Sequence, residues 1–391
     1  MHRTSNRFPE GVARPRDDRP IAIRVGTNMG VFYCQTRNLL LPYSQFVVQR
    51  EWDPMALADR IWSLLTGRPH PKWHWLFHDL GRRGSQMFHF YNCVSRTTKP
   101  WVVTAETALT ELRSPSFEPI QFALGEACKA ILHLSRWGYE RQLRDLEPRI
   151  AARLVNKMRV CHPPQRLLAR ELTERDYQRS DVRFILVGHS FYRKGGYETV
   201  VALDRLRREG YGFHLDIVGR MFYGEANNSA FGVQRQERLH AIVGANPRHF
   251  TLHGILSNEQ TLALLRDCDV GLLPSLVERY GFAVLEFMAS GLPVVTTNQR
   301  AFPEINDPAR GWLAQLPTAN GVIAWKTSDE KRTTSAHLEE ELYRIFRTIL
   351  DCPSQIRTKS GAALRYIADN HDPGAFVQRM AELYRQALEK R

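Results

Sequence analysis

The chain has 391 residues, of which 43% are hydrophobic and 24% are charged, and no stretch reaches the roughly 18 uninterrupted apolar residues of a membrane-spanning helix. These values exclude a disordered or fibrous protein and one with membrane-spanning helices, and the length suits two domains with a core each. The net charge of +13 is uneven: residues 1–180 hold 28 Lys and Arg against 17 Asp and Glu, whereas the other residues hold 26 against 24.

The basic N-terminal half suggests an anionic partner, such as an acidic membrane surface, a phosphate-linked acceptor or nucleic acid. The alternative is that its arginines reflect only solubility and codon bias. Residues 1–20 are rich in Arg, Pro and Asp without an apolar segment, which predicts a flexible leader rather than a secretory signal, and hence a cytoplasmic protein. Six scattered cysteines without a Cys-x-x-Cys pair favour free thiols over disulfide bonds or a metal site.

In the N-terminal half, short runs rich in β-branched and aromatic residues predict strands. These runs are Ile21–Val25, Trp73–His78, Met87–Asn92, Trp101–Glu106 and Cys128–Ser135. Apolar residues at helical spacing predict helices over Tyr33–Leu41 and Gly138–Leu146, and Gly26–Gly30 reads as the loop after the first strand. Pro163 and the proline after it break regular structure, so the charged residues 165–180 are predicted to form a hinge between two domains.

The second half opens with a predicted strand over Val182–Gly188, a polar loop and a helix over Glu198–Arg208. The loop carries Lys194 beside Arg193, followed by two glycines. Because cations can meet a diphosphate while glycines let the backbone approach it, this pattern predicts a phosphate cradle.

The same periodicities predict the remaining elements. They are the strands Phe213–Gly219 and Phe250–Gly254, the helix Asn258–Cys268, the largely irregular stretch Pro317–Ala336, and the helices His337–Leu350 and Pro373–Leu388. The last helix has a predicted buried stripe of Phe376, Met380, Leu383 and Ala387.

The most informative stretch is Asp269–Thr297. Its apolar runs Val270–Leu273 and Pro293–Thr297 predict two strands, and apolar residues at helical spacing predict a helix over Phe282–Ser290 that stops at Gly291. Strand, loop, helix and strand in so few residues make a right-handed βαβ unit with parallel strands. In such a unit, the loop after the first strand and the start of the helix line the crevice where ligands bind.

Two carboxylates and a helix start are placed at that crevice. Glu278 lies in the loop and Glu286 on the helix behind it, while backbone N–H groups near Gly281 and Phe282 favour an anion such as a phosphate. The two carboxylates stand in the pattern Pro-Ser-x-x-Glu-x-Tyr-Gly-x-x-x-x-Glu-x-x-Ala-x-Gly-x-Pro-Val-Val. This pattern closely resembles the signature of the retaining GT-B glycosyltransferases of family 4, the glycosyl transferase group 1.

The resemblance extends from Ile21 to the C-terminus and is strongest over Val182–Ile305. It implies an α/β fold of the GT-B type, with two Rossmann-like domains facing each other across a cleft and a C-terminal helix that crosses back to the first domain. The expected parts are a flexible leader (1–20), an N-terminal acceptor-binding domain (21–165), a C-terminal donor-binding domain for the nucleotide sugar (181–370) and the crossing helix (371–391).

The resemblance also implies roles for single residues. In the family, the loop glutamate touches the donor sugar and the helical one holds the ribose hydroxyls, which assigns these roles to Glu278 and Glu286, with Lys194 on the diphosphate. Glu106 stands where many members carry a histidine. Either Glu106 or His89 on the neighbouring strand serves as the polar group of the acceptor or sugar pocket, or both lack a chemical role, an interpretation favoured for His89. The predicted catalytic set is Glu278, Lys194 and Glu106.

Other donor-binding positions follow from the same resemblance. His189 replaces the family's arginine near the lysine, so Arg193 either supplies the missing charge or is an exposed loop charge. The remaining donor-binding residues are Gly219, Gly254, Ile255, Ser275, Tyr280, Gly281 and Phe282. Gly26 and Gly30 take the place of a Gly-rich acceptor loop, and Asn298–Ile305 that of the family's Gly-Gly-x-Pro-Glu loop.

The implied reaction is a retaining, metal-independent transfer of a sugar from a nucleotide diphosphate to a hydroxyl acceptor. Asp267-Cys-Asp269 looks like a metal-holding pair, but it stands where the family has an Ala-Asp turn, so no metal is expected. The alternative is a catalytically degenerate GT-B domain that binds a nucleotide sugar or a protein partner without turnover. The expected partners are a nucleotide-sugar donor, a glycan or lipid-linked acceptor and, through peripheral contact of the basic half, an anionic membrane. A nucleic-acid partner rests on charge alone and is not expected.

Overall fold

The structure is a computed structural model that describes residues 23–27, 46–50, 53–70, 72–79, 84–169, 181–188, 190–220, 230–323, 325 and 327–389. The predicted leader, the helix predicted over Tyr33–Leu41, and Gly30 lie outside these ranges. Within them, no helix is both long and apolar enough to span a membrane.

The N-terminal sheet contains, as far as the chain is described, six parallel strands in the order β2-β1-β4-β6-β7-β8. Burial of nearly every residue of its central strands is typical of a parallel sheet covered on both faces. The strands are β1 (Ile23–Thr27), β2 (Phe46–Arg50), β4 (Met87–Tyr91), β6 (Trp101–Ala105), β7 (Cys128–His133) and β8 (Met158–Val160). The accompanying helices are α2 (Pro54–Thr66), α3 (Ile120–Ala123), α4 (Arg136–Arg144) and α5 (Pro148–Leu154).

Two details of this domain differ from the sequence prediction. The stretch Trp73–His78 is not one strand: a 3-10 turn, η1 (Trp73–Trp75), precedes the short β3 (Leu76–Phe77), which pairs with β5 (Val94–Ser95). The turn forms because the His70 ring accepts a hydrogen bond from the Trp73 N–H at 3.2 Å and stacks on the Trp73 ring at 3.9 Å. Gly26 lies within β1 rather than in the following loop.

The C-terminal sheet, within the described residues, has six parallel strands in the order β11-β10-β9-β12-β13-β14. Numbered along the domain, this is the Rossmann order 3-2-1-4-5-6. The strands are β9 (Val182–Val187), β10 (Phe213–Val218), β11 (Phe250–Gly254), β12 (Val270–Leu273), β13 (Val294–Thr297) and β14 (Gly311–Ala314). The helices are α6 (Gly196–Arg208), α7 (Ala230–Ala245), α8 (Asn258–Leu265), α9 (Phe282–Ala289), α10 (Phe302–Ile305), α11 (Ser328–Asp351), α12 (Ser354–Asn370) and α13 (Pro373–Glu389).

Helix α11 begins nine residues before the predicted start at His337, so the prediction of irregular structure up to Ala336 is wrong at its end. A reciprocal capping box explains the earlier start: the Thr327 side chain accepts from the Glu330 N–H, and the Glu330 side chain accepts from the Thr327 N–H.

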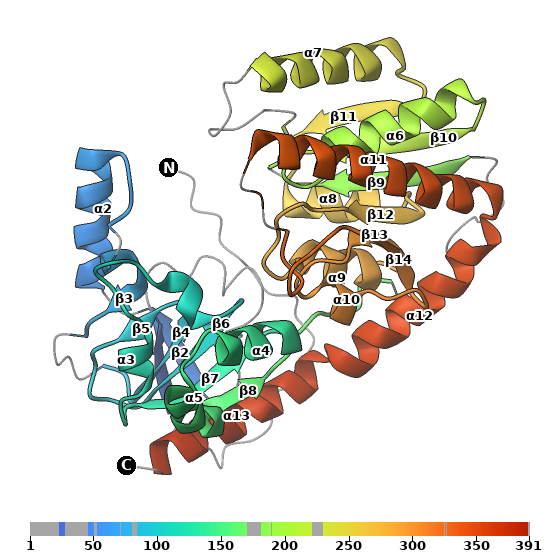
Figure 1. Ribbon diagram of the computed structural model, residues 1–391. Coiled ribbons are helices and arrows are strands. Elements are labelled where there is room, and N and C mark those ends of the chain that lie inside the picture. Colours follow the sequence, from blue (N-terminus) through green and yellow to red (C-terminus); the bar gives the residue numbers. More distant parts are fainter. Residues whose placement is uncertain are drawn as a thin grey trace.

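Helices α12 and α13 run from the C-terminal domain back along the N-terminal domain (Figure 1). The predicted stripe of α13 is buried, from Phe376 to Ala387. Tyr384, on the same helix, contacts His89 of β4 by a hydrogen bond of 2.6 Å. The expected crossing helix is therefore confirmed.

Candidate functional site

The site is organised around the switch point of the C-terminal sheet, where β9 and β12 are neighbours and their connections leave in opposite directions. The loops after these two strands are tied together. The Leu276 N–H and the Ser275 hydroxyl both donate to the Arg193 carbonyl, at 2.9 and 3.1 Å. Gly195 passes so close to the other loop that a Cβ there would lie 2.2 Å from the Pro274 carbonyl oxygen, so only glycine fits.

Lys194 and Glu278 meet across these two loops. The Lys194 Nζ contacts the Glu278 Oε2, and the two side chains are only 15% and 16% exposed. The Lys194 stem passes over Gly188, where a Cβ would lie 2.9 Å from the Lys194 Cγ. The structure thus brings together the cation and the carboxylate to which the family resemblance assigns contacts with the diphosphate and the sugar.

Two helix starts lie beside this ion pair. Helix α6 begins after Gly195 (φ 75°) and α9 after Gly281 (φ 94°), and no side chain caps either helix in the described part of the chain. Both glycines are in the left-handed region, which L residues rarely enter. At Gly281 a Cβ would also lie 2.4 Å from the Phe302 ring. The first-turn N–H groups of both helices therefore supply partial positive charge at the same sheet edge as Lys194.

The other predicted glycines lie at the carboxyl edge of β10 and β11. The Gly219 N–H donates to the Gly254 carbonyl at 2.7 Å, and a Cβ on Gly219 (φ 141°) would lie 2.2 Å from the Gly188 carbonyl oxygen. Gly254 has φ 70°, and Ile255 after it is half exposed. Since the carboxyl ends of parallel strands share one edge of the sheet, these residues lie at the same edge as Lys194.

Glu106 of the N-terminal domain lies just after β6, opposite the loop that carries Glu278 and Arg279. Its carboxylate lies 3.7 Å from the Arg279 guanidinium, and its N–H donates to the Asn92 Oδ1 at 2.8 Å. Burial raises the pKa of Glu106, the Arg279 guanidinium lowers it, and the Glu278 carboxylate raises it again. The two predicted carboxylates thus lie near each other although they belong to different domains.

The remaining predicted residues differ in what their side chains can do. Ser275 is buried, and its hydroxyl is hydrogen-bonded to the backbone carbonyls of Arg193 and Val277. The Tyr280 ring is fully buried beside Phe282, with ring centroids 5.2 Å apart. The structure therefore places the Tyr280 side chain in the hydrophobic core around α9 and not at the surface of the site.

Three further positions complete the predicted set. The Arg193 side chain is exposed, which is compatible both with a loop charge and with a cation that reaches the diphosphate. Its carbonyl accepts a hydrogen bond from the Ser275 hydroxyl of the other loop. Glu286 is half-buried in the second turn of α9, behind the loop of Glu278. His189 lies outside the described residues.

His89 has a structural position instead of a place in a pocket. Its Nδ1 contacts the Tyr384 hydroxyl at 2.6 Å and its Nε2 the Thr104 hydroxyl at 2.8 Å. Burial lowers the pKa of His89 to about 3, so the ring is neutral. Both ring nitrogens are used, which leaves Glu106 as the polar group at the end of the N-terminal sheet.

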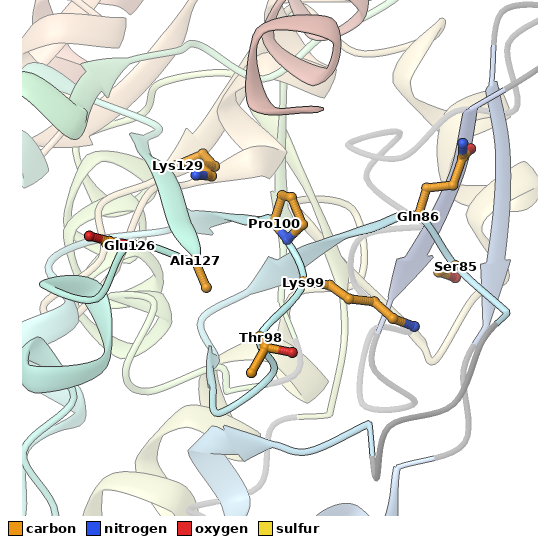
Figure 2. A pocket seen from close by; sticks show the side chains of 8 residues that line it. All are labelled: Ser85, Gln86, Thr98, Lys99, Pro100, Glu126, Ala127 and Lys129. Carbon is orange, nitrogen blue, oxygen red and sulfur yellow. The ribbon is translucent and has the colours of Figure 1, made fainter. Parts of the chain in front are cut away.

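Two other polar features lie at the opposite, amino edges of the sheets. Asp269 precedes β12 and its Oδ2 accepts from the Arg183 N–H at 2.8 Å, so the Asp267-Cys-Asp269 run is separated from Glu278 by the length of a strand. A hollow of about 540 Å³ lies before β4, β6 and β7. Figure 2 shows its lining residues, which are Ser85, Gln86, Thr98, Lys99, Pro100, Glu126, Ala127 and Lys129. The hollow lies at the end of the sheet away from Glu106.

The sequence did not single out two groups that join the domains. Arg279, in a variable position of the signature, reaches Glu106. The Glu304 carboxylate accepts hydrogen bonds from the Arg136 N–H at 2.8 and 3.0 Å and thereby caps α4 of the other domain. The Ser135 hydroxyl accepts from the Gly138 N–H at 3.1 Å within the same helix start, whereas Glu304 lies 168 residues further along the chain than Arg136, which no local pattern reveals.

Comparisons with known proteins agree with this geometry. Residues 181–324 match the family described as "Glycosyl transferases group 1". The glycogen synthase of Mycobacterium tuberculosis is 36% identical over 114 residues, which is 29% of this chain and 25% of that protein. This chain therefore aligns with about a quarter of that relative's length. The resemblance to the group 1 glycosyltransferases is confirmed over the C-terminal domain.

Solved structures resemble nearly the whole chain. Sucrose-phosphate synthase from Thermosynechococcus elongatus has a TM-score of 0.62 at 14% identity, covering 94% of this chain and 100% of that one. HepE of Anabaena, solved in complex with UDP and glucose, has a TM-score of 0.58 at 13% identity, covering 93% and 100%. At such identities the likeness shows the fold, and the predicted GT-B arrangement of two Rossmann-like domains is confirmed.

Proposed function

We propose that this chain, whose second domain is of the group 1 glycosyltransferase type, moves a sugar from a nucleotide-diphosphate donor to a hydroxyl acceptor, with retention of configuration and without a metal. The observation that carries the proposal is the contact of Lys194 with Glu278 at the switch point, beside the uncapped starts of α6 and α9. The UDP and glucose bound by HepE support a nucleotide sugar as the donor.

The chemistry asked of the protein is to neutralise the charge that develops on the departing diphosphate. Lys194 and the first-turn N–H groups of α6 and α9 would supply that positive charge. Because these groups are already in position, they would stabilise the transition state without a cost of reorganisation. Without donor, Glu278 compensates Lys194. A diphosphate would take over Lys194, so that Glu278 becomes available to the sugar hydroxyls.

The rest of the donor would extend along the same edge. Glu286 would hold the ribose hydroxyls, and the backbone at Gly254 and Ile255 would meet the base. No side chain is needed as a covalent nucleophile in this scheme. The acceptor hydroxyl would approach from the N-terminal domain, where Glu106 is the polar group beside Glu278.

The same charges support metal independence as part of the proposal. The Asp267-Cys-Asp269 run lies before β12, at the sheet edge opposite Glu278, and Lys194 with two helix starts already compensates a diphosphate. Retention rests on the family resemblance. A glycan or a lipid-linked intermediate as acceptor, a cytoplasmic location and peripheral contact with an anionic membrane stay predictions.

The test is nucleotide release by the purified full chain, with a panel of nucleotide sugars, with and without a chelator. We expect turnover of at least one donor, unchanged by the chelator. Lys194→Ala should lower kcat about 10²- to 10³-fold, the usual effect of removing one group that stabilises the transition state. Arg248→Ala, which removes an exposed cation of the same domain, should leave kcat unchanged.

Calorimetry with the same donors distinguishes an active transferase from the alternative, a domain that binds a nucleotide sugar without turnover. A donor that binds tightly but is never turned over would favour a degenerate binding domain. Absence of both binding and turnover across the panel would refute the proposal.

A further inference from the structure

Strand β11 carries an extra residue near its carboxyl end. Leu252 pairs with Ile217 of β10, but the next pair along the two strands is Gly254 with Val218. His253 is therefore the inserted residue of a β-bulge. Such insertions are rare between parallel strands, and they redirect the chain that follows, often next to a binding site.

The His253 side chain is fixed to a buried carboxylate on the neighbouring strand. Its Nε2 lies 2.7 Å from the Asp216 Oδ1, and the two side chains are 25% and 1% exposed. Burial raises the pKa of Asp216, but the hydrogen bonds of His214 and His253 and the charge of Arg183 outweigh this and hold the pKa below its ordinary value. Because an ionised carboxylate only accepts hydrogen bonds, the His253 Nε2 carries the proton and donates it to Asp216.

Asp216 is the centre of a small polar network. Its Oδ2 accepts from the Arg183 Nη2 at 2.9 Å and contacts the Cys268 Sγ at 3.7 Å, while its Oδ1 also lies 3.6 Å from the His214 Nε2. Its register partner on β9 is Ile185, which belongs to the apolar core. A carboxylate buried beside an apolar core costs free energy unless its oxygens are paired. Packing alone therefore does not explain Asp216, whereas a network that fixes the orientation of its members does.

The bulge directs the turn after β11 to the carboxyl edge of the sheet. Gly254 leaves the strand with φ 70°, and its carbonyl accepts from the Gly219 N–H at 2.7 Å. Ile255, the next residue, is 51% exposed although it is apolar. As far as the sheet is described, β11 is its outermost strand, so its outer backbone groups face away from the other strands. An apolar side chain beside such backbone groups suits a nucleobase, which has an apolar ring face and an edge of donors and acceptors.

The spacing of the strands places this turn within reach of a nucleotide held at Lys194. One strand, β10, separates β11 from β9, and two strand spacings amount to about 10 Å. A nucleoside diphosphate spans a distance of this order from its phosphates to its base. With its phosphates at Lys194 and the start of α6, its base would therefore lie near Gly254.

We propose that His253 and Asp216 are a positioning pair for the donor nucleotide, whose hydrogen bond holds the bulge in the shape that presents the backbone of Gly254 and Ile255 to the base. His253 acts through the backbone that follows it and is not a catalytic residue. This role rests on the proposed function, because it names a determinant of nucleotide affinity at the same site.

The test is calorimetry of the full chain with UDP, ADP, GDP and inorganic pyrophosphate. Pyrophosphate reports binding of the phosphates alone, whereas the nucleotides report binding of the phosphates and the base. We expect at least one nucleotide to bind more tightly than pyrophosphate. His253→Ala should lower the affinity for that nucleotide about tenfold, the usual effect of losing a hydrogen bond to a charged group, and should leave the affinity for pyrophosphate unchanged.

Three variants serve as comparisons. His253→Gln, whose amide can donate to Asp216 in place of the ring, should restore most of the nucleotide affinity. His253→Leu, which keeps the volume of the side chain without a donor, should behave as His253→Ala does, so that a failure of either variant to fold leaves the other to decide. His240→Ala, at an exposed histidine of α7, is the matched control and should bind every probe as the unchanged chain does.

Two further measurements separate this role from a general loss of structure. With a donor that is turned over, His253→Ala should raise KM about tenfold while kcat changes less than about twofold, as expected when binding is lost equally in the ground state and the transition state. Lys194→Ala, in contrast, should weaken pyrophosphate and the nucleotides alike. Circular dichroism of each variant checks the fold.

Equal losses of nucleotide and pyrophosphate affinity in the folded His253 variants, or no loss of either, would overturn the role of the pair and leave the proposed function standing. Absence of binding of every nucleotide and of pyrophosphate to the unchanged chain would refute both.

Discussion

Arg279 lies beside two carboxylates, those of Glu106 and Glu278. Arg279 and Glu278 shift the pKa of Glu106 in opposite directions. The Arg279 guanidinium lies 3.7 Å from the Glu106 carboxylate, and the Arg279 backbone N–H donates to the Oε1 of the adjacent Glu278 at 3.1 Å. Burial and Glu278 both raise the pKa of Glu106, whereas Arg279 lowers it. Arg279 thus opposes the rise in the pKa of Glu106 that burial and Glu278 cause.

Removing Arg279 should shift the acid side of the pH profile. Since Glu106 loses its charge as the pH falls through its raised pKa, Arg279→Ala raises that pKa further and activity should decline from a higher pH than in the unchanged chain. The measurement is kcat/KM for nucleotide release against pH. Glu106→Gln should remove this limb, and Arg279→Lys should restore part of it. Identical acid limbs in the unchanged chain and Arg279→Ala would contradict the role.

At the scale of elements, helix α4 is completed by the other domain. Its N-cap Ser135 satisfies the Gly138 N–H at 3.1 Å, and Glu304 of α10 accepts from the Arg136 N–H, which no residue of α4 could do. Trp137 also donates its ring N–H to the Asn320 carbonyl at 2.9 Å. The orphan donors of one helix thus hold the two domains against each other.

Glu304→Ala should destabilise this arrangement by about 1 kcal/mol, the usual cost of losing a helix cap and its charge at the helix start. Glu304→Gln, which keeps an acceptor without the charge, should lose less. Urea unfolding followed by circular dichroism measures the change. Glu140→Ala removes an exposed i,i+4 pair with Arg144 and should change little; a loss equal to that of Glu304→Ala would count against interdomain capping.

At the scale of the whole molecule, three buried neutral histidines make the fold sensitive to acid. Burial lowers the pKa of His89 to about 3 and those of His133 and His371 to about 4. His89 contacts Tyr384 of α13, and His371 contacts the Pro163 carbonyl at 2.7 Å. Two of the three therefore join the crossing helix region to the N-terminal domain.

The folded pKa values lie below the unfolded value near 6.5, so the unfolded chain binds more protons between them. Stability should be complete above about pH 6.5 and fall as the pH drops toward about 4, by about 2 kcal/mol for each histidine at about pH 5. The midpoint of urea unfolding at a series of pH values measures this. His89→Gln, which can keep hydrogen bonds but does not titrate, should flatten the dependence; an unchanged slope would show that His89 is not one of the groups responsible.

The fold was largely predictable because its signals are local. Parallel strands such as β9 and β12 are continuous apolar runs, and glycines mark the starts of α6 and α9. The signature around Glu278 identified the family type, and Lys194 was placed by its loop alone. The early start of α11 and the turn at Trp73 were missed because they depend on a side-chain cap and on a ring stack.

The sequence by itself determined which residues end the strands of the second domain and which stand in the loops after them, since apolar runs and loop glycines are local patterns. Only the tertiary structure decided which side chains face the carboxyl edge of that domain's sheet. It placed Tyr280 in the core, gave both nitrogens of His89 to structural partners, and brought Arg279 to Glu106 from another domain. It also joined His253 of β11 to Asp216 of β10, because pairing between strands brings together residues whose proximity no local pattern encodes.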